Sequence, residues 1–201
     1  MFLLRKPTET AAFALIDTSR GAKFSYPEPE CTRHGCPPGY VHDRYRIRLG
    51  AGEDVYNRAC RGLQQWAMFP RDRAAVFSRT SSLHDGLTMA VAVRCWGVWL
   101  LNPCRVVFVE EETGPRRRFA FAYGTLPGHV ERGEERFEVL WDQADGSVWF
   151  EVNAMSRPAN PLMWLVYPLA RREQRRFVRH MLQTMLKAVS EVDQHVTIQS
   201  G

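Results

Sequence analysis

The sequence predicts an α+β fold in which a bent antiparallel sheet of about six to seven strands wraps around one long C-terminal helix. Between residues 75 and 155, apolar and polar side chains alternate in short segments separated by tight turns, a pattern typical of antiparallel neighbours. After residue 168, the apolar positions recur instead at helical spacing. A meander of strands cannot bury a large apolar face alone, so the terminal helix is expected to cover it.

The residues ahead of the meander predict an irregular extension, one strand and one helix. Residues 1–40 are expected to be irregular and to pack on the domain, since 26–39 is rich in proline and glycine. His42–Leu49 alternates as a strand does. Glu53–Phe69 then repeats apolar positions at helical spacing, with acidic residues in its first turn, and Pro70 is expected to end that helix.

Six further strands are expected, joined by short turns that contain glycine. Their expected ranges are Ala75–Thr80, Leu87–Cys95, Val98–Val109, Arg117–Gly124, Glu131–Trp141 and Ser147–Met155. Large apolar side chains recur at every second position of the fourth and fifth of these strands. We expect that face to look inward, toward the helix.

The chain is expected to close with a long amphipathic helix. Ser156 and Asn160 are both candidate N-caps, each followed by a proline near the helix start. Pro168 is expected to kink or restart the helix. This helix completes one domain over residues 41–193, and residues 194–201 are expected to form a disordered tail.

Length and composition indicate one globular domain with at most a short appendage. The chain has 201 residues, of which 45% are hydrophobic and 24% charged, so it can bury a core without disulfides or metal. No apolar run approaches the roughly 18 residues of a membrane helix, and charges follow too soon after the first residues for a signal peptide. We therefore expect a cytoplasmic monomer or homodimer that does not enter a membrane.

The net charge of +5 comes almost entirely from arginine, which favours bidentate contact with phosphate or carboxylate. Two arginine groups are candidates for nucleic-acid contact, one along the exposed side of the terminal helix and one at the start of a strand. They are Arg172, Arg175, Arg176 and Arg179, and the run 116–118. Such stripes are usually solvated faces, and no nucleic-acid-binding motif accompanies them, so nucleic acid is not the expected partner.

The five cysteines are irregularly spaced, as is typical of a reducing compartment. Cys31 and Cys36, with His34 between them, are the one cluster that suggests a metal. A structural zinc site needs four ligands, and a second cysteine pair is absent from the sequence. We therefore expect no metal and no cofactor.

The segment from Tyr123 to Phe137, YGTLPGHVERGEERF, resembles the signature of an uncharacterised family catalogued as Domain of Unknown Function nineteen-ninety. Ser156-Arg157-Pro158 resembles its C-terminal signature, and Leu49-Gly50-Ala51-Gly52 resembles its N-terminal part. The family has no established activity, but its order of elements is similar to that of the START-like (SRPBCC) helix-grip superfamily. This similarity implies a helix-grip fold with an apolar ligand enclosed between sheet and C-terminal helix. It implies no catalytic residue.

The first functional hypothesis is a module that binds a small apolar or amphipathic molecule between sheet and helix. Pockets of that kind are mostly apolar, with a few convergent polar groups. The candidate ligand-binding residues are Met89, Trp99, Phe119, Phe121, Tyr123, Phe137, Trp149, Arg157 and Met181. The alternative is that these side chains fill the core, as such residue types usually do.

The second hypothesis is a small-molecule enzyme in which Glu135 and His129 carry protons in the same pocket. Because strand side chains alternate, Glu135 shares the face of Phe137 and is expected to point inward. An unpaired carboxyl in an apolar cavity has a raised pKa, which suits a general acid or base. The alternatives are that Glu135 pairs with Arg157 or Arg105, and that His129 hydrogen-bonds its own turn.

Overall fold

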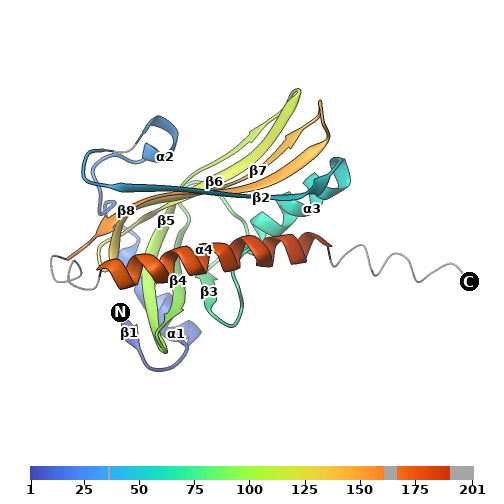
Figure 1. Ribbon diagram of the computed structural model, residues 1–201. Helices are drawn as coiled ribbons and strands as arrows, with labels where there is room; N and C mark the ends of the chain where they lie inside the picture. The colour runs from blue at the N-terminus through green and yellow to red at the C-terminus, as the bar shows by residue number, and fades with distance from the viewer. Residues whose placement is uncertain (36, 161–166, 191–201) are drawn as a thin grey trace, which may run out of the picture.

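A strongly curved antiparallel sheet bends around one side of the C-terminal helix in the computed structural model, which describes residues 1–35, 37–160 and 167–190 (Figure 1). Seven strands follow one another across the sheet in the order β2-β8-β7-β6-β5-β4-β3. Their bounds are β2 Val41–Ala51, β3 Ala74–Ser78, β4 Thr88–Cys95, β5 Val98–Glu112, β6 Arg116–Thr125, β7 Glu131–Asp142 and β8 Ser147–Pro158. A two-residue strand, β1 (Phe2–Leu3), pairs with β5 as the eighth.

The pairing of consecutive strands from β3 to β8 confirms the expected meander. Helix α4 (Tyr167–Ser190) runs along the concave side of the sheet (Figure 1), which confirms the expected helix-grip fold. It packs through five buried side chains spaced along one face: Val178, Met181, Leu182, Met185 and Val189. Pro168 is the second residue of this helix, where the missing N–H would have no intrahelical partner.

The start of the C-terminal segment differs from the sequence prediction. Ser156, expected to cap the helix, is instead part of β8, because its strand continues to pair with Val41 on one side and with Gly133 on the other. Asn160 follows the end of that strand. The segment expected to begin the helix, 161–166, and the expected tail at 194–201 lie outside the described residues.

Helix α3 (Glu53–Gln64) lies between the sheet and the second half of α4 (Figure 1). Its buried side chains, Tyr56, Ala59 and Leu63, face the sheet. The helix ends before Phe69, the predicted last residue, because Trp66 adopts a left-handed conformation with φ of +59° and turns the chain. Trp66 and Phe69 then reach into the core from this turn.

The expectation that residues 1–40 are irregular is wrong for two segments. Helix α1 (Glu9–Ser19) begins after Thr8, whose side chain accepts a hydrogen bond from the Ala11 N–H. The buried residues Ala12 and Ile16, one turn apart, pack α1 on the outer face of the sheet against β3, β4 and β5. The single turn α2 (Cys31–His34) also contacts the sheet, at β7 and β8.

A buried carboxylate holds the segment before and within α2 to β7. Glu134 accepts hydrogen bonds from the Tyr26 hydroxyl (2.7 Å), the Glu30 N–H (2.8 Å), and both the N–H and the hydroxyl of Thr32. Tyr26 lies directly over Gly124, where a Cβ atom would stand 2.2 Å from the phenol oxygen. The segment before and within α2 therefore covers the outer face of the sheet at Gly124 and Glu134, and the open space lies on the inner face.

Candidate functional site

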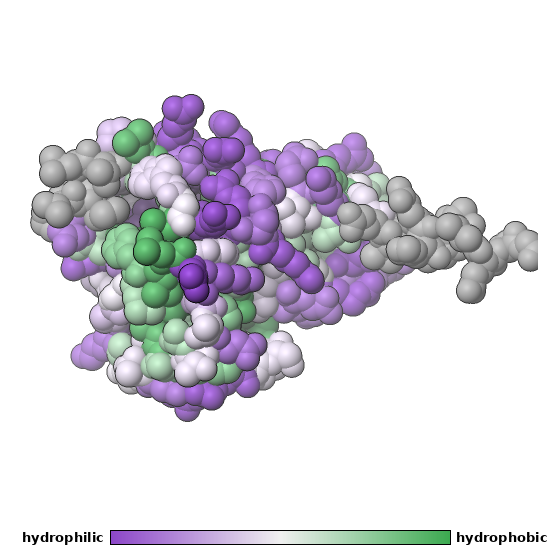
Figure 2. Space-filling view, turned by 90° about the horizontal axis from the view of Figure 1, so that it is seen from below, coloured by the Kyte–Doolittle hydropathy of each residue, from purple (hydrophilic) through white to green (hydrophobic). Residues whose placement is uncertain are grey.

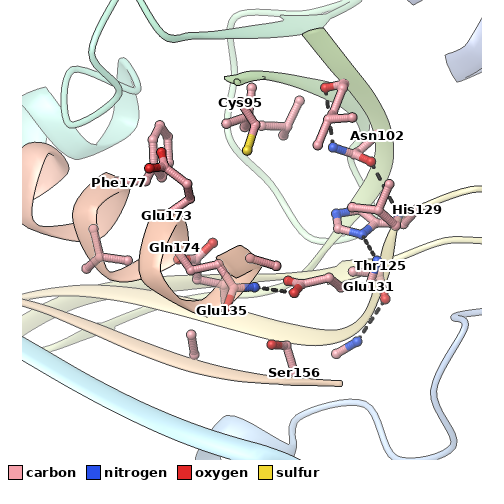
Figure 3. A pocket seen from close by; sticks show the side chains of 18 of the residues that line it. Cys95, Asn102, Thr125, His129, Glu131, Glu135, Ser156, Glu173, Gln174 and Phe177 are labelled. Atoms are coloured by element: carbon pink, nitrogen blue, oxygen red, sulfur yellow. Dashed lines mark hydrogen bonds between the residues drawn. The ribbon is translucent and has the colours of Figure 1, made fainter. Parts of the chain in front are cut away.

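A cavity of about 330 Å³ lies between the inner face of the sheet and the first half of α4. Its walls come from β2, β4, β5, β6, β7 and β8 on one side and from residues 170–178 on the other. Figure 3 shows side chains of the sheet and of α4 converging on this space. The volume is at the lower end of the range for small-molecule pockets.

The cavity occurs here because bulky side chains fill the other half of the gap between sheet and helix. The ring centroid of Trp66 lies 4.9 Å from that of Phe121, and the centroid of Phe69 lies 6.1 Å from that of Phe137. Phe69 itself borders the cavity, and Ala154 is a small residue on the sheet side of its wall. The gap between the sheet and α4 is therefore filled near α3 and open near the start of α4.

Two aromatic side chains lie at the mouth of the cavity. Phe2 and Trp96 line it, yet they are 66% and 58% exposed. Trp96 has φ of +49° and forms the β4–β5 turn together with Gly97, so a non-glycine residue holds a left-handed conformation at this edge. On the face seen from below, hydrophobic surface gathers among hydrophilic side chains (Figure 2).

Glu135 points into the cavity from β7, as the strand alternation predicts. Its Oε2 atom accepts a hydrogen bond of 2.5 Å from the Tyr123 hydroxyl on the neighbouring strand, which is its register partner. Burial raises the pKa of Glu135 to about 7, and the Tyr123 hydrogen bond opposes this shift. Near neutral pH, both the protonated and the ionised form of Glu135 are therefore populated.

Glu131 is the second carboxyl in the cavity, on the same face of β7 as Glu135. It accepts a hydrogen bond from the side-chain amide of Gln174 on α4 (Figure 3). Burial, and then the negative charge of Glu135, raise the pKa of Glu131 to about 7. The two carboxyls thus disfavour each other's ionised forms.

His129 lies on the turn that leads into β7. Its Nδ1 atom accepts a hydrogen bond from the Glu131 N–H at 2.9 Å, which places the imidazole proton on Nε2. Burial lowers the pKa of His129 to about 4, so the ring is neutral at pH 7. It can donate a hydrogen bond from Nε2, but it supplies no positive charge to the carboxyls.

Two further acidic side chains of the cavity, Asp43 and Glu173, have cationic partners. Arg171 of α4 lies 2.5 Å from Asp43 of β2, and Arg73 lies 3.2 Å from Glu173. These ion pairs connect α4 to two edges of the sheet. The part of the cavity around Glu131 and Glu135 has no such partner among the described residues.

The structure brings three of the predicted site residues together at the cavity: Tyr123, His129 and Glu135. Five others are buried in the core on the inner side, but they do not line the cavity. These are Met89, Phe119, Phe121, Phe137 and Met181. Their location agrees with the alternative that they fill the core.

Trp99, Trp149 and Arg157 lie away from the cavity, on the outer side of the sheet. Trp99 packs with α1, and Trp149 lies under the guanidinium of Arg46. Arg157 occupies a strand position next to the inward-facing Ser156, and its guanidinium lies 4.7 Å from the ring centroid of Tyr40. The sequence had not settled which face of β8 and β5 was inward.

The expected pairing of Glu135 with Arg157 or Arg105 is wrong. Both arginines belong to the opposite face of the sheet from Glu135. Arg105 donates hydrogen bonds to the backbone oxygens of Ser19, Arg20 and Ala22 after α1.

Two site residues were missed by the sequence interpretation, Glu131 and Gln174. Alternation along β7 from Glu135 places Glu131 on the same face, so a signal was present. Gln174 lies on the helical face that carries Phe177 and Val178, and a polar residue on an apolar stripe was also a signal. Neither residue belongs to a sequence motif of a known catalytic or binding site.

The arginine groups are partly engaged within the protein. Arg116, Arg117 and Arg118 each form an ion pair, with Asp142, Glu53 and Glu110 among their partners. Among the described residues, no group of three or more His, Cys, Asp or Glu side chains is arranged to hold a metal ion. Cys36 of the suggested Cys31–Cys36 cluster lies outside them.

The fold and the cavity together define a helix-grip protein with a small internal pocket between sheet and terminal helix. The model of the family described as Domain of unknown function (DUF1990) matches residues 25–184, and the chain belongs to this family. The family expected from the signature segment is thereby confirmed. No helix within the described ranges is both long and apolar enough to cross a membrane.

Relatives and solved structures extend the comparison. A UPF0548 protein of Deinococcus radiodurans is 36% identical over 203 residues, covering 94% of this chain and 98% of the relative. A UPF0548 protein of Arabidopsis thaliana is 33% identical over 155 residues, covering 76% and 75%. The hypothetical protein jhp0584 from Helicobacter pylori is similar in structure with a TM-score of 0.51 at 12% identity, covering 83% of this chain and 94% of that one. The protein TTHA0849 from Thermus thermophilus has a TM-score of 0.51 at 13% identity, covering 76% and 98%. The structural likenesses bear on the fold alone.

Proposed function

We propose that the protein binds a small amphipathic molecule in the cavity between the sheet and α4. The cavity itself carries the proposal, because an apolar wall ends in a few polar groups that converge on one place. The apolar part of the molecule would lie against residues such as Val91 and Phe177, and its polar group beside Glu131 and Glu135. Each Å² of apolar surface removed from water would contribute on the order of 25 cal/mol.

Native mass spectrometry of the protein purified from its own host tests this proposal, followed by extraction of any bound molecule. Ala154→Phe is designed to fill the cavity, since Ala154 lines it opposite Glu135 on β8. Ala51→Phe is the matched control, because Ala51 is exposed at the far end of the β2–β8 pair. We expect a bound mass in wild type and in the control, and its loss in Ala154→Phe. An equal bound mass in all three proteins would contradict the proposal.

A second function, acid–base catalysis in the same cavity, is favoured by one specific observation. Two carboxyls with pKa values raised to about 7 share the cavity, and one is hydrogen-bonded to the Tyr123 hydroxyl. A group that titrates near the working pH is effective both as a proton donor and as a proton acceptor.

Incubation of the extracted molecule with the protein separates binding from catalysis. If Glu135 transfers a proton, Glu135→Gln should still bind the molecule, and its conversion should slow by roughly 10²–10⁴-fold. Wild-type protein that returns the molecule unaltered would contradict the enzymatic function and leave the binding function in place. Conversion by Glu135→Gln at the wild-type rate would exclude Glu135 alone and direct attention to Glu131 and His129.

A further inference from the structure

The negative charges of Glu131 and Glu135 are not balanced by positive charges of the described residues in the cavity. Among the described carboxyls that face it, Asp43 and Glu173 are neutralised by Arg171 and Arg73. Glu131 and Glu135 have hydrogen-bond partners that carry no charge, the Gln174 amide and the Tyr123 hydroxyl.

The remaining ionisable groups of the lining do not restore the balance. They are Tyr45 of β2, Arg94 and Cys95 of β4, Cys104 of β5, His129 before β7 and Glu134 of β7. Arg94 is exposed, and by strand alternation it lies on the outer side of β4. Glu134 is saturated by four donors on the outer side of β7. The phenol, thiols and imidazole carry no positive charge near pH 7. Arg171 favours the ionised form of Glu131, but its own partner Asp43 opposes that effect, so no unpaired cation of the described lining compensates the two carboxyls.

The geometry around the two carboxyls leaves room for a head group. Gly133 lies between them along β7, and its backbone lines the cavity. A Cβ atom at this position would stand 1.8 Å from the Met155 backbone oxygen, so no side chain can be accommodated there. Only one oxygen of Glu135, Oε2, accepts a hydrogen bond from the described residues, and the other is uncommitted. The Ser156 hydroxyl, which also lines the cavity, has no hydrogen-bond partner among them either (Figure 3).

We propose that the ligand of this cavity is an amphipathic amine whose ammonium group lies between Glu131 and Glu135, with its hydrocarbon part along the apolar wall. This inference rests on the proposed binding function and names the chemical class of its ligand. An ammonium supplies three N–H donors and the missing positive charge. A carboxylate ligand would add a further negative charge, and a neutral alcohol would leave both carboxyls unpaired.

Three probes with the same ten-carbon chain test the head group: decylamine, decanol and decanoate. Decanol is used below its solubility limit, and the two ionic probes are used below their micelle-forming concentrations. Isothermal titration calorimetry at pH 8 compares them, because Glu131 and Glu135 are then largely ionised and the amine is cationic. We expect decylamine to bind at least about tenfold more tightly than decanol, which corresponds to about 1.4 kcal/mol. Decanoate should bind most weakly. At pH 5, where both carboxyls are protonated, the preference for the amine should largely disappear.

Variants assign that preference to the two carboxyls. In the double variant Glu131→Gln, Glu135→Gln, decylamine and decanol should bind with similar affinity. Glu111→Gln is the control, since Glu111 is an exposed β5 carboxyl outside the cavity. It should keep the wild-type preference for the amine. Because a variant can also fold poorly, the probe comparison on wild-type protein decides the inference by itself.

The outcomes separate this inference from the proposed function. If decanol or decanoate binds wild type as tightly as decylamine, and Ala154→Phe abolishes that binding, the cavity binds ligands and the amine inference is wrong. If Ala154→Phe leaves the affinity for all three probes unchanged, or none of them binds wild type, the proposed function itself is contradicted.

Discussion

Glu135 titrates near neutral pH because it is buried and has no cationic partner among the described residues. Its hydrogen bond from Tyr123 stabilises the ionised form, yet burial outweighs it and raises the pKa to about 7. The folded protein therefore binds more protons at Glu135 than the unfolded chain does between about pH 4.5 and 7. Its contribution to stability is fully present below that window and is lost as the pH rises through it.

Glu135→Gln should accordingly gain stability relative to wild type as the pH rises. Glutamine does not titrate, and its presence also removes the negative charge that helps to raise the pKa of Glu131. We expect the difference in unfolding free energy, variant minus wild type, to be about 1–3 kcal/mol larger at pH 8 than at pH 5. Melting temperatures at the two pH values measure it, as a change of several degrees.

The pKa shift of His129, also in the cavity, has the opposite sign to that of Glu135. The pKa of His129 is lowered to about 4, so the unfolded chain binds the extra proton, and this contribution to stability grows as the pH rises from 4 to 6.5. His129 is present in both proteins, and its contribution cancels in the difference. A difference that is the same at pH 5 and pH 8 would show that Glu135 does not titrate in this window.

At the scale of elements, the sequence predicted whether most segments are strands or helices. The spacing of buried residues, which distinguishes the two, can be recognised within a short stretch of sequence. The meander and the terminal helix follow from alternation and from helical spacing. Helix α1 could not be found this way, because two of its three buried residues, Ala12 and Ser19, are small and leave only Ile16 to mark an apolar face. Its formation depends on packing against β4 and β5, which lie far along the chain.

The segment that contains α2 is held to β7 chiefly by Glu134, and Tyr26→Phe tests this attachment. The substitution removes one of the donors to a buried carboxylate and leaves the ring in place over Gly124. We expect a loss of about 1–3 kcal/mol in unfolding free energy. Amide hydrogen exchange should also accelerate at Thr32, whose N–H donates to the same carboxylate.

Tyr45→Phe is the matched control, because Tyr45 is not among the described donors to Glu134. It should leave both the stability and the Thr32 exchange rate near their wild-type values. Equal effects of the two substitutions would mean that the Glu134 cluster is not what holds this segment.

At the scale of the whole molecule, the site could be predicted only in part. Strand alternation located Glu135, and the turn before β7 located His129 at the edge of the cavity. The sequence could not show that α3, Trp66 and Phe69 fill one half of the gap, so the aromatic residues of that half were interpreted as ligand contacts. It also could not assign inner and outer faces to β5 and β8, which misplaced Trp99, Trp149 and Arg157.

The difference between a filled and an open half is a property of the assembled molecule. Side chains from α3, β6 and β7 fill the gap between sheet and helix at one end, and the cavity remains at the other. The cavity is thus the feature on which the functional account depends.

Two-dimensional ¹H–¹⁵N NMR of the isotopically labelled protein, titrated with decylamine, tests that account most directly. The account predicts saturable shifts at amides of the cavity wall, such as Val91, Glu135 and Gln174, and none of comparable size around α1 on the outer face. The same titration of Ala154→Phe should produce no such shifts. Saturable shifts confined to the exposed arginine face of α4, or shifts that persist in Ala154→Phe, would contradict a ligand site between sheet and helix.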